Sequence, residues 1–346
     1  MAAMRFDPSW QNDPQAFQAL VEPYRRALQL HCYRMLGSLH EAEDLVQETL
    51  LRAWRARSDF EGRSSVRTWL YRIATNTCLN ALERRRRQGG TTTRSLPAWQ
   101  GPPTDDYPEG TPPTEIAWLE PYPDLALDGL VDPVPGPAAR YELHESVQLA
   151  FVAAIQQLPP RQRAVLLLRD VLGWSAAEAA LLLESSVAAV NSALQRARAT
   201  LEDCYPSGQP SHLPPGTVEQ RSLVERYMRA WEGADLDGLV ALLREDASLS
   251  MPPWPAWYHG RVSIRALCAW AWRQDPPRDV RLVLSGANGQ PAVAVYRRAP
   301  TDGRLRAHSI HVLTLDGSAV AATTVFLEPA LFAAFGLPSS LPDPPA

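Results

Sequence analysis

The chain has 346 residues, of which 45% are hydrophobic and 21% charged, and its formal net charge is -4 at pH 7. This length predicts two or three domains, and the composition is typical of soluble globular ones. The four cysteines lie far apart without a Cys-x-x-Cys pair, which argues against a disulfide framework or a zinc site and favours a reducing cytosol.

No apolar run has the length of a membrane span, and the N-terminus lacks the apolar segment of a secretion signal. We therefore expect no contact with a membrane and a cytoplasmic location. All of the Lys and Arg positions are arginine. This suggests a GC-rich genome and says little about mechanism.

Residues 14–87 are predicted to be helical, because apolar residues recur at spacings of three and four. Within this segment, residues 60–87 interleave the aromatic residues Phe60, Trp69 and Tyr71 with arginines. Rings that stack on bases, combined with cations that follow the phosphates, are typical of proteins that hold unpaired nucleic acid. Since the whole chain is slightly acidic, this basic stretch is a local feature.

The composition changes between residues 88 and 138, where prolines are frequent and no long periodic segment occurs. This predicts an extended or irregular linker. Inside it, the stretch WLEPYPD (residues 118–124) carries two large aromatic residues, Trp118 and Tyr122. We interpret this stretch as a docked segment; the alternative is a loose chain with scattered aromatic residues.

Residues 139–204 are predicted to be helical again and to contain a helix-turn-helix. One helix runs from Leu158 to Leu172, Ser175 and Glu178 form a capping box for a short second helix, and residues 184–186 form a turn. The next helix, residues 187–201, should bury Val187, Val190, Leu194 and Leu201. Its outward residues suit base and phosphate contacts and are Ser186, Asn191, Ser192, Gln195, Arg196 and Arg198. An ordinary helical hairpin with a solvated face remains the alternative.

A stretch rich in Pro, Gly and Ser, residues 206–216, leads to a third unit of mixed character. Helices are expected at 218–243, with a break at Gly233, and at 261–273. Strands are expected at 281–285, 292–297, 306–315 and 319–327, with turns at Asn288-Gly289 and Asp316-Gly317. His308 and His311 are at odd spacing on one strand, so they should not form a paired metal site.

Both helical units together resemble the sigma-70 family of bacterial RNA polymerase initiation factors, and in particular the group that keeps only regions 2 and 4. The resemblance is carried by EAEDLVQET (residues 41–49), TWLYRIATN (68–76), the arginines at 84–87, and the segment from LPPRQR (158–163) to Arg198. The third unit resembles the SnoaL-like, ketosteroid-isomerase-like fold. A subgroup of extracytoplasmic-function sigma factors has this combination.

The resemblance implies a multidomain fold with two all-α sigma domains, a region 2 helical bundle and a region 4 helix-turn-helix, followed by an α+β SnoaL-like cone. The implied boundaries are 10–90 for region 2, 91–138 for the linker, 139–204 for region 4 and 217–337 for the SnoaL-like domain.

The resemblance also implies partners, namely core RNA polymerase, through its beta-prime clamp and beta flap, and promoter DNA. The acidic face of the helix at 39–55, with Glu41, Asp44, Gln47 and Glu48, would grip the clamp helices; a solvated acidic face is the alternative. Residues matching Phe60 and Asn76 help to hold a base flipped from the −10 element. Trp69 is expected in the core, and the remaining −10 contacts would come from Arg72, Arg84, Arg85 and Arg86.

The chain departs from the family at Glu184, where related sequences often have glycine in the turn of the helix-turn-helix. The function expected is that of a sigma factor that recognises −10 and −35 elements and whose C-terminal domain modulates activity, with Trp118 and Tyr122 as docking residues. No catalytic residue, cofactor or metal is predicted. A small-molecule ligand and an anti-sigma partner stay open.

Two other functions were weighed. One is a stand-alone helix-turn-helix regulator, which would need neither the acidic helix nor the aromatic and arginine-rich segment. The other is a pocket enzyme fused to a DNA-binding arm, for which His259, His308 and His311 are candidate residues. Fold analogy alone does not establish catalysis.

Overall fold

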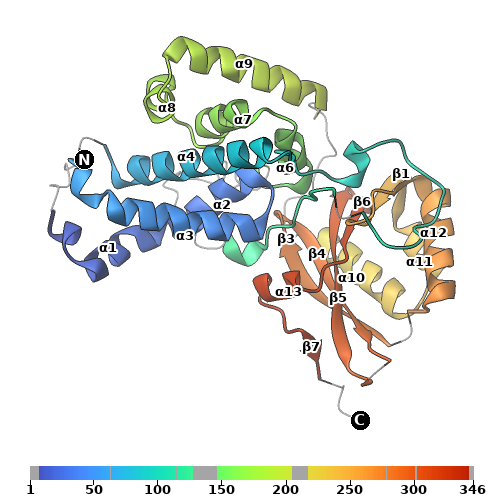
Figure 1. Cartoon of the computed structure of the whole chain (residues 1–346). Coiled ribbons are helices and arrows are strands. Elements are labelled where there is room, and N and C mark those ends of the chain that lie inside the picture. Colours follow the sequence, from blue (N-terminus) through green and yellow to red (C-terminus); the bar gives the residue numbers. More distant parts are fainter. Residues whose placement is uncertain are drawn as a thin grey trace. The chain divides into compact units, whose positions relative to one another are not determined.

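The computed structural model describes residues 8–62, 64–113, 115–127, 146–204, 217–277, 279–300 and 302–342 (Figure 1). The chain forms two compact units, which we call unit 1 (residues 1–94 and 126–206) and unit 2 (residues 95–125 and 207–346). Both helical segments predicted from the sequence lie in unit 1, whereas residues 95–125 of the predicted linker belong to unit 2. Residues 128–138 of that linker, residues 139–145 and the stretch 206–216 lie outside the described residues.

The first half of unit 1 is built from α1 (Pro14–Val21), α2 (Arg25–Leu36), α3 (Leu39–Arg55) and α4 (Val66–Arg87). Ser38 and Ser65 cap the N-termini of α3 and α4 with their side chains, and Gly37 ends α2 in the left-handed conformation that glycine tolerates best. The helices α2, α3 and α4 pack together (Figure 1) around an apolar core that includes Leu28, Met35, Leu39, Ala42, Leu70 and Leu82.

The second half of unit 1 contains α6 (Leu149–Gln156), α7 (Pro160–Leu166), α8 (Ala176–Leu182) and α9 (Val187–Cys204). The sequence predicted one helix from Leu158 to Leu172; in the structure α7 is followed by a π-helical turn, Leu167–Val171. The capping box of Ser175 and Glu178 is confirmed. Val190 and Leu194 are buried as expected, but Val187 is 45% exposed, because the first turn of α9 lies outside the core.

Glu184 occupies the turn between α8 and α9 with a φ of 49°. This is the left-handed conformation, which glycine adopts more easily than glutamate does. Because a Cβ atom is disfavoured in this region of φ, the turn keeps its geometry at a cost of about 1–2 kcal/mol. The turn still closes, since the Ser185 amide donates to the carbonyl of Ala180 at 2.9 Å.

A fully buried arginine, Arg163, connects the two halves of unit 1. Its guanidinium donates to the carbonyl oxygens of Ile155 at 3.0 Å, Gln156 at 2.8 Å, Leu158 at 3.1 Å and Met35. Burial lowers the pKa of Arg163 to about 9, which leaves the group charged at neutral pH. A buried charge needs such partners, so these carbonyls and Arg163 depend on one another.

Unit 2 contains a sheet with the strand order β2-β1-β6-β5-β4-β3, and β7 pairs with β5. The strands are β1 (Leu243–Ser250), β2 (Trp257–His259), β3 (Val280–Ala287), β4 (Gln290–Arg298), β5 (Leu305–Asp316), β6 (Ala319–Phe326) and β7 (Ser340–Leu341). All neighbouring pairs are antiparallel except β1 with β6. The sequence missed β1, β2 and β7, because β1 is rich in polar residues and the other two are very short.

The predicted turn between β3 and β4 is present at Asn288 and Gly289, whose φ angles of 58° and 67° are those of a tight hairpin turn. The helices α10 (Val218–Glu232), α11 (Leu236–Ala241) and α12 (Gly260–Gln274) pack against one face of the sheet (Figure 1). The core between them includes Leu223, Tyr227, Ile264, Leu267, Val293 and Leu313. The short helix α13 (Leu331–Ala334) places Phe332 edge-on to Tyr296, with ring centroids 5.1 Å apart.

His311 lies in this core and is neutral. Its Nδ1 shares a hydrogen bond of 2.9 Å with the Tyr227 hydroxyl, and its Nε2 shares one of 3.1 Å with Ser309. Burial lowers the pKa of His311 to about 3, with a smaller contribution from His308.

No helix among the described residues is long and apolar enough to cross a bilayer.

The titration of His311 predicts a pH dependence of stability. The unfolded chain takes up a proton below about pH 6.5 while the folded chain does not, so the free energy of unfolding falls as the pH drops below 6.5. For one such group, the loss between pH 7.5 and 5.5 is about 1.4 kcal/mol. We expect His311→Asn to be less stable at pH 7.5 but to lose about 1.4 kcal/mol less over this interval. Urea unfolding at both pH values measures this, and equal losses would contradict it.

Candidate polymerase and nucleic-acid interfaces

The acidic face of α3 contains the four residues predicted to contact a partner protein. Asp44 and Gln47 are exposed. Glu48 is half-buried and pairs with Arg52 one turn away at 2.7 Å, and this hydrogen bond lowers the pKa of the Glu48 carboxyl. Asp44 and Gln47 therefore form the accessible part of the face, with Glu48 at its edge.

Glu41 differs from the other three. Arg85 Nη2 lies 2.5 Å from both of its carboxylate oxygens, and Arg94 Nη2 lies 2.9 Å from Oε1. Burial by itself would raise the pKa of Glu41, but the charges and hydrogen bonds of Arg94 and Arg85 outweigh it and lower the pKa. Glu41 therefore ties α3 to the end of α4 and to the chain that follows it.

This arrangement departs from the phosphate contact predicted for Arg85. Its side chain is only 24% exposed and points toward Glu41, because its position on α4 faces α3. Arg84, Arg86 and Arg87 are exposed at the same helix end. Arg86 and Arg87 each pair with Glu83 at 2.9 Å, and these hydrogen bonds lower the pKa of Glu83 to about 2.

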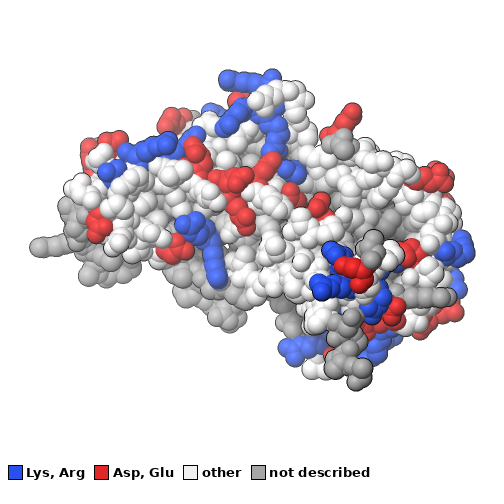
Figure 2. Space-filling model, turned by 60° about the horizontal axis from the view of Figure 1, so that its bottom comes forward, with Lys and Arg blue, Asp and Glu red and all other residues white. Residues whose placement is uncertain are grey.

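The other predicted −10 residues of α4 are Arg72 and Asn76, which lie one helical turn apart. Arg72 is exposed and Asn76 half-buried, so both can be reached from the same face of the helix. Figure 2 shows both positive and negative side chains on the face that it draws.

Phe60 is not accessible in the structure, contrary to what a base contact requires. Its side chain is 6% exposed, and its ring centroid lies 4.9 Å from that of Trp69 and 5.8 Å from that of Trp10. Trp69 itself is 5% exposed, which agrees with its expected place in the core. A base could reach Phe60 only after Trp10 had moved.

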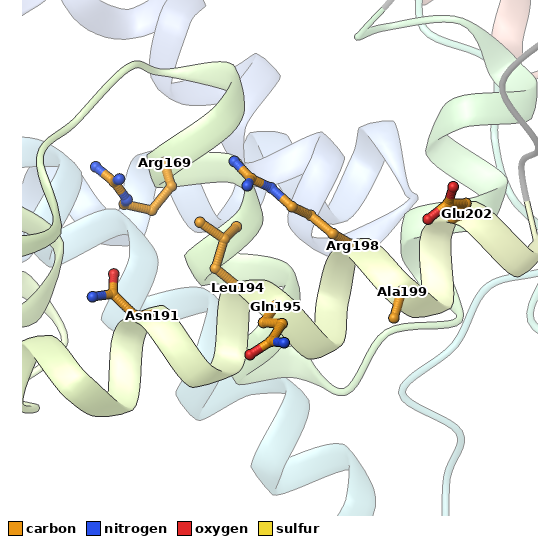
Figure 3. Close-up of a pocket in the computed structure, with 7 residues that line it drawn as sticks. All are labelled: Arg169, Asn191, Leu194, Gln195, Arg198, Ala199 and Glu202. Carbon is orange, nitrogen blue, oxygen red and sulfur yellow. The ribbon is translucent and has the colours of Figure 1, made fainter.

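The recognition helix α9 and the turn before it expose all six residues predicted to read DNA: Ser186, Asn191, Ser192, Gln195, Arg196 and Arg198. Asn191, Gln195 and Arg198 line an open groove together with Arg169 from the π-helical turn (Figure 3). Asp170 holds Arg198 through bonds of 2.7 and 2.8 Å, which raise the pKa of Arg198. Arg169 was not predicted from the sequence, where its only signal is a cation directly after the apolar run AVLLL (residues 164–168).

The WLEPYPD stretch is docked within unit 2. The Tyr122 amide donates to Asn288 Oδ1 at 2.8 Å, and the Asn288 amide donates to the Tyr122 carbonyl at 2.8 Å. Asp124 Oδ1 accepts a hydrogen bond of 2.8 Å from the Gly289 amide. Tyr122 is fully buried. The hairpin turn between β3 and β4 is therefore the site to which this stretch binds.

A close approach at Gly286 makes this docking possible. A Cβ atom added to Gly286 would lie 2.4 Å from Asp124 Oδ2. Trp118, the other predicted docking residue, is half-buried and forms a backbone bridge with Ser95 at the start of unit 2. The segment is thus held at both ends by backbone contacts within unit 2.

A second linker segment, residues 101–107, packs on α12 and β2 within unit 2, and this contact was not predicted from the sequence. Tyr107 stacks on Trp270 with ring centroids 5.0 Å apart and 2° between the planes. The Tyr258 hydroxyl donates to the Asp106 carbonyl at 2.8 Å, and Trp257 Nε1 donates to the Gly101 carbonyl at 2.8 Å. The available signal in the sequence was Tyr107, an aromatic residue in a proline-rich stretch.

Comparison with known proteins identifies the family. Residues 20–88 match Sigma-70 region 2, residues 148–201 match Sigma-70 region 4 and residues 224–322 match the SnoaL-like domain. The chain is 50% identical over 327 residues to the ECF RNA polymerase sigma factor SigG of Mycobacterium tuberculosis, covering 94% of this chain and 85% of that protein. This chain belongs to the extracytoplasmic-function group of the sigma-70 family.

Two further proteins resemble this chain. The RNA polymerase sigma-H factor of Pseudomonas aeruginosa is 31% identical over 190 residues, which cover 55% of this chain and 86% of that protein. The crystal structure of the extracytoplasmic function sigma factor SigJ of Mycobacterium tuberculosis covers 92% of this chain and 99% of that chain, at 21% identity and a TM-score of 0.57. The likeness to SigJ shows the shared fold.

The family and the fold class predicted from the sequence are thus confirmed. As a sigma factor, the protein binds core RNA polymerase and directs initiation at promoters. The stand-alone regulator does not account for the match to region 2 or for 50% identity over nearly the whole chain.

The docking of WLEPYPD predicts the effect of Gly286→Ala. The added methyl group displaces the Asp124 carboxylate and so removes its hydrogen bond to Gly289, a charge-assisted bond. We expect hydrogen exchange of the backbone amides in residues 118–124 to become about tenfold faster, equivalent to about 1.4 kcal/mol. Gly101→Ala adds the same methyl group into open space and is the matched control. Unchanged exchange in Gly286→Ala would show that the contact does not hold the linker.

Proposed function

We propose that Asp44 and Gln47, with Glu48 at the edge, form the contact with the clamp helices of the polymerase beta-prime subunit. What supports this is the exposure of Asp44 and Gln47 on one face of α3, whereas Glu48 also pairs with Arg52. Glu41 acts as a positioning residue in this proposal, because its carboxylate is already bound by Arg85 and Arg94. Region 4 takes the contact with the beta flap.

The −10 element is bound by α4 in this proposal. Arg72, Arg84 and Arg86 are exposed cations that contact phosphates, while Phe60 and Asn76 hold a flipped base. Arg85 stabilises the helix end through Glu41. Arg86 must leave Glu83 to bind DNA, but this exchange costs little because solvent screens an exposed ion pair.

The −35 element is read by the outward residues of α9 and the preceding turn. Asn191 and Gln195 carry amides that suit adenine, and Arg196 and Arg198 suit guanine or phosphate. Their accessibility on the recognition helix supports the assignment. Arg196 donates to Ser192 one turn away at 2.6 Å, which orients its guanidinium along the helix.

We further propose that the SnoaL-like domain is a non-catalytic modulator of the sigma regions. The linker joins regions 2 and 4 along the chain, and its residues 95–125 are part of unit 2. Binding Tyr122 and Tyr107 removes much of the freedom that a proline-rich tether would have. Once regions 2 and 4 separate from each other on the polymerase, the domain limits the distances between them.

A catalytic role for this domain has less support. His311 is neutral and engaged by Tyr227 and Ser309, and burial lowers the pKa of His308 to about 4. His259 lies in β2 at the edge of the sheet, separated from β5 in the strand order by β1 and β6. These histidines therefore do not converge on one point. We place the protein in the cytoplasm, where polymerase and promoters are found.

Charge reversal at Asp44 tests the polymerase contact. We expect Asp44→Arg to weaken binding to core polymerase about tenfold or more, since an interface charge is inverted while no internal bond is lost. The melting temperature should stay the same. Glu219→Arg, which reverses an exposed charge on α10, is the control. Titration of labelled protein with core enzyme measures the affinity, and equal affinities of both variants would refute the assignment.

Run-off transcription tests the role of the docked linker. The templates are promoters that differ only in the distance between the −10 and −35 elements. We expect the wild type to prefer a narrow range of spacings and Gly286→Ala to transcribe off-optimum templates severalfold better, because its linker is released. Gly101→Ala should behave as the wild type. Superimposable spacing profiles for the wild type and Gly286→Ala would leave the modulator proposal without support.

A further inference from the structure

The short helical turn at Pro8–Gln11 lies over Phe60, the residue to which we assign a flipped promoter base. Trp10 is only 7% exposed, and its ring centroid is 5.8 Å from that of Phe60 and 6.2 Å from that of Trp69. An indole ring thus occupies the aromatic surface on which a base would stack. Bases stack on such rings with little regard to sequence, so indole and base compete for the same place.

Gln11 fastens this turn to the backbone beside Phe60. Its Nε2 donates to the carbonyl oxygens of Arg57 and Phe60, each at 3.0 Å. In return, Arg57 Nε donates to the Gln11 carbonyl at 2.5 Å. Arg57 is itself held over the ring of Trp54 at 3.8 Å. The turn is therefore attached to the same loop that presents Phe60.

The turn can leave without unfolding the helix that follows. The helix α1 has its own cap, since the Asp13 side chain accepts a hydrogen bond from the Gln15 amide at 2.8 Å. It also has its own anchor in the core, where Phe17 meets Trp54 with ring centroids 5.2 Å apart. Between the turn and this cap, Asn12 is exposed. Release therefore needs rotations near Asn12 and the loss of the polar contacts of Gln11. It also separates the ring of Trp10 from those of Phe17, Phe60 and Trp69.

We propose that the turn Pro8–Gln11 is an autoinhibitory plug of the −10 base site. It covers Phe60 and Trp69 until an unpaired base of the promoter replaces the ring of Trp10. The proposal rests on the base-holding role of Phe60. Because only the open form can accept the base, the apparent affinity for melted DNA is reduced by the fraction of molecules in which the turn is closed.

The test measures promoter opening by the complete holoenzyme, with 2-aminopurine in the −10 element as the reporter of unstacking. Gln11→Ala removes two hydrogen bonds of the plug and leaves every aromatic ring in place. We expect the opening rate to rise about fivefold or more, in line with the usual strength of two such bonds. Gln15→Ala, at an exposed position of α1, should match the wild type. Trp10→Ala should open at least as fast as Gln11→Ala.

Equal rates for Gln11→Ala and Gln15→Ala, or slower opening in Gln11→Ala, would overturn the plug and show that the turn is inert or supports the site. Phe60→Ala in the Gln11→Ala background, where the plug is already released, separates this outcome from a failure of the assigned base site: if the double variant opens promoters as fast as Gln11→Ala, the base-holding role of Phe60 is wrong. Hydrogen exchange provides a second measurement that is independent of the rates. The backbone amides of residues 10–12 should lose protection when the holoenzyme binds a melted −10 strand, and retained protection would contradict the proposal.

Discussion

The buried guanidinium of Arg163 is the interaction on which unit 1 depends. Removing a charge from water is costly, so each of its donors must find an acceptor. The acceptors are carbonyl oxygens at the ends of α2 and α6 and in the loop before α7, together with the Gln156 side chain at 2.7 Å. Because carbonyl positions are set by the backbone, one side chain fixes how these chain segments meet.

Gln156 extends this network to a second arginine. Its Nε2 donates to the Arg34 carbonyl at 2.9 Å, and Arg34 in turn binds the carbonyl and hydroxyl oxygens of Ser146 at 3.1 and 2.6 Å. The segment that begins region 4 is thereby tied to α2 by buried polar bonds. Such bonds are directional, so they define one packing arrangement where apolar contacts alone would allow several.

The polar and charged residues of unit 1 fall into two groups, those that bind one another and those that face solvent, and the amino-acid composition does not distinguish them. Glu41, Arg85 and Arg94 are bound to one another and stabilise the join between helices, whereas Asp44, Gln47 and Arg72 face solvent. Only the second group can change partners without a loss inside the protein. The aromatic residues divide in the same way: Trp69 is core, and Phe60 becomes available only if the turn that carries Trp10 opens.

The sequence by itself determined the family, the fold class, the capping box of α8 and the hairpin turn at Asn288. The family and the fold class followed from a resemblance carried by several motifs. The capping box and the turn follow from local spacing, because local rules of capping and turn formation survive in almost any tertiary context. Only the tertiary structure decided that Arg85 faces Glu41, that Phe60 lies beneath Trp10 and that Tyr107 stacks on Trp270. Each of these contacts joins residues far apart in the chain, and the partner that a side chain meets there depends on how whole elements pack, which no local pattern encodes.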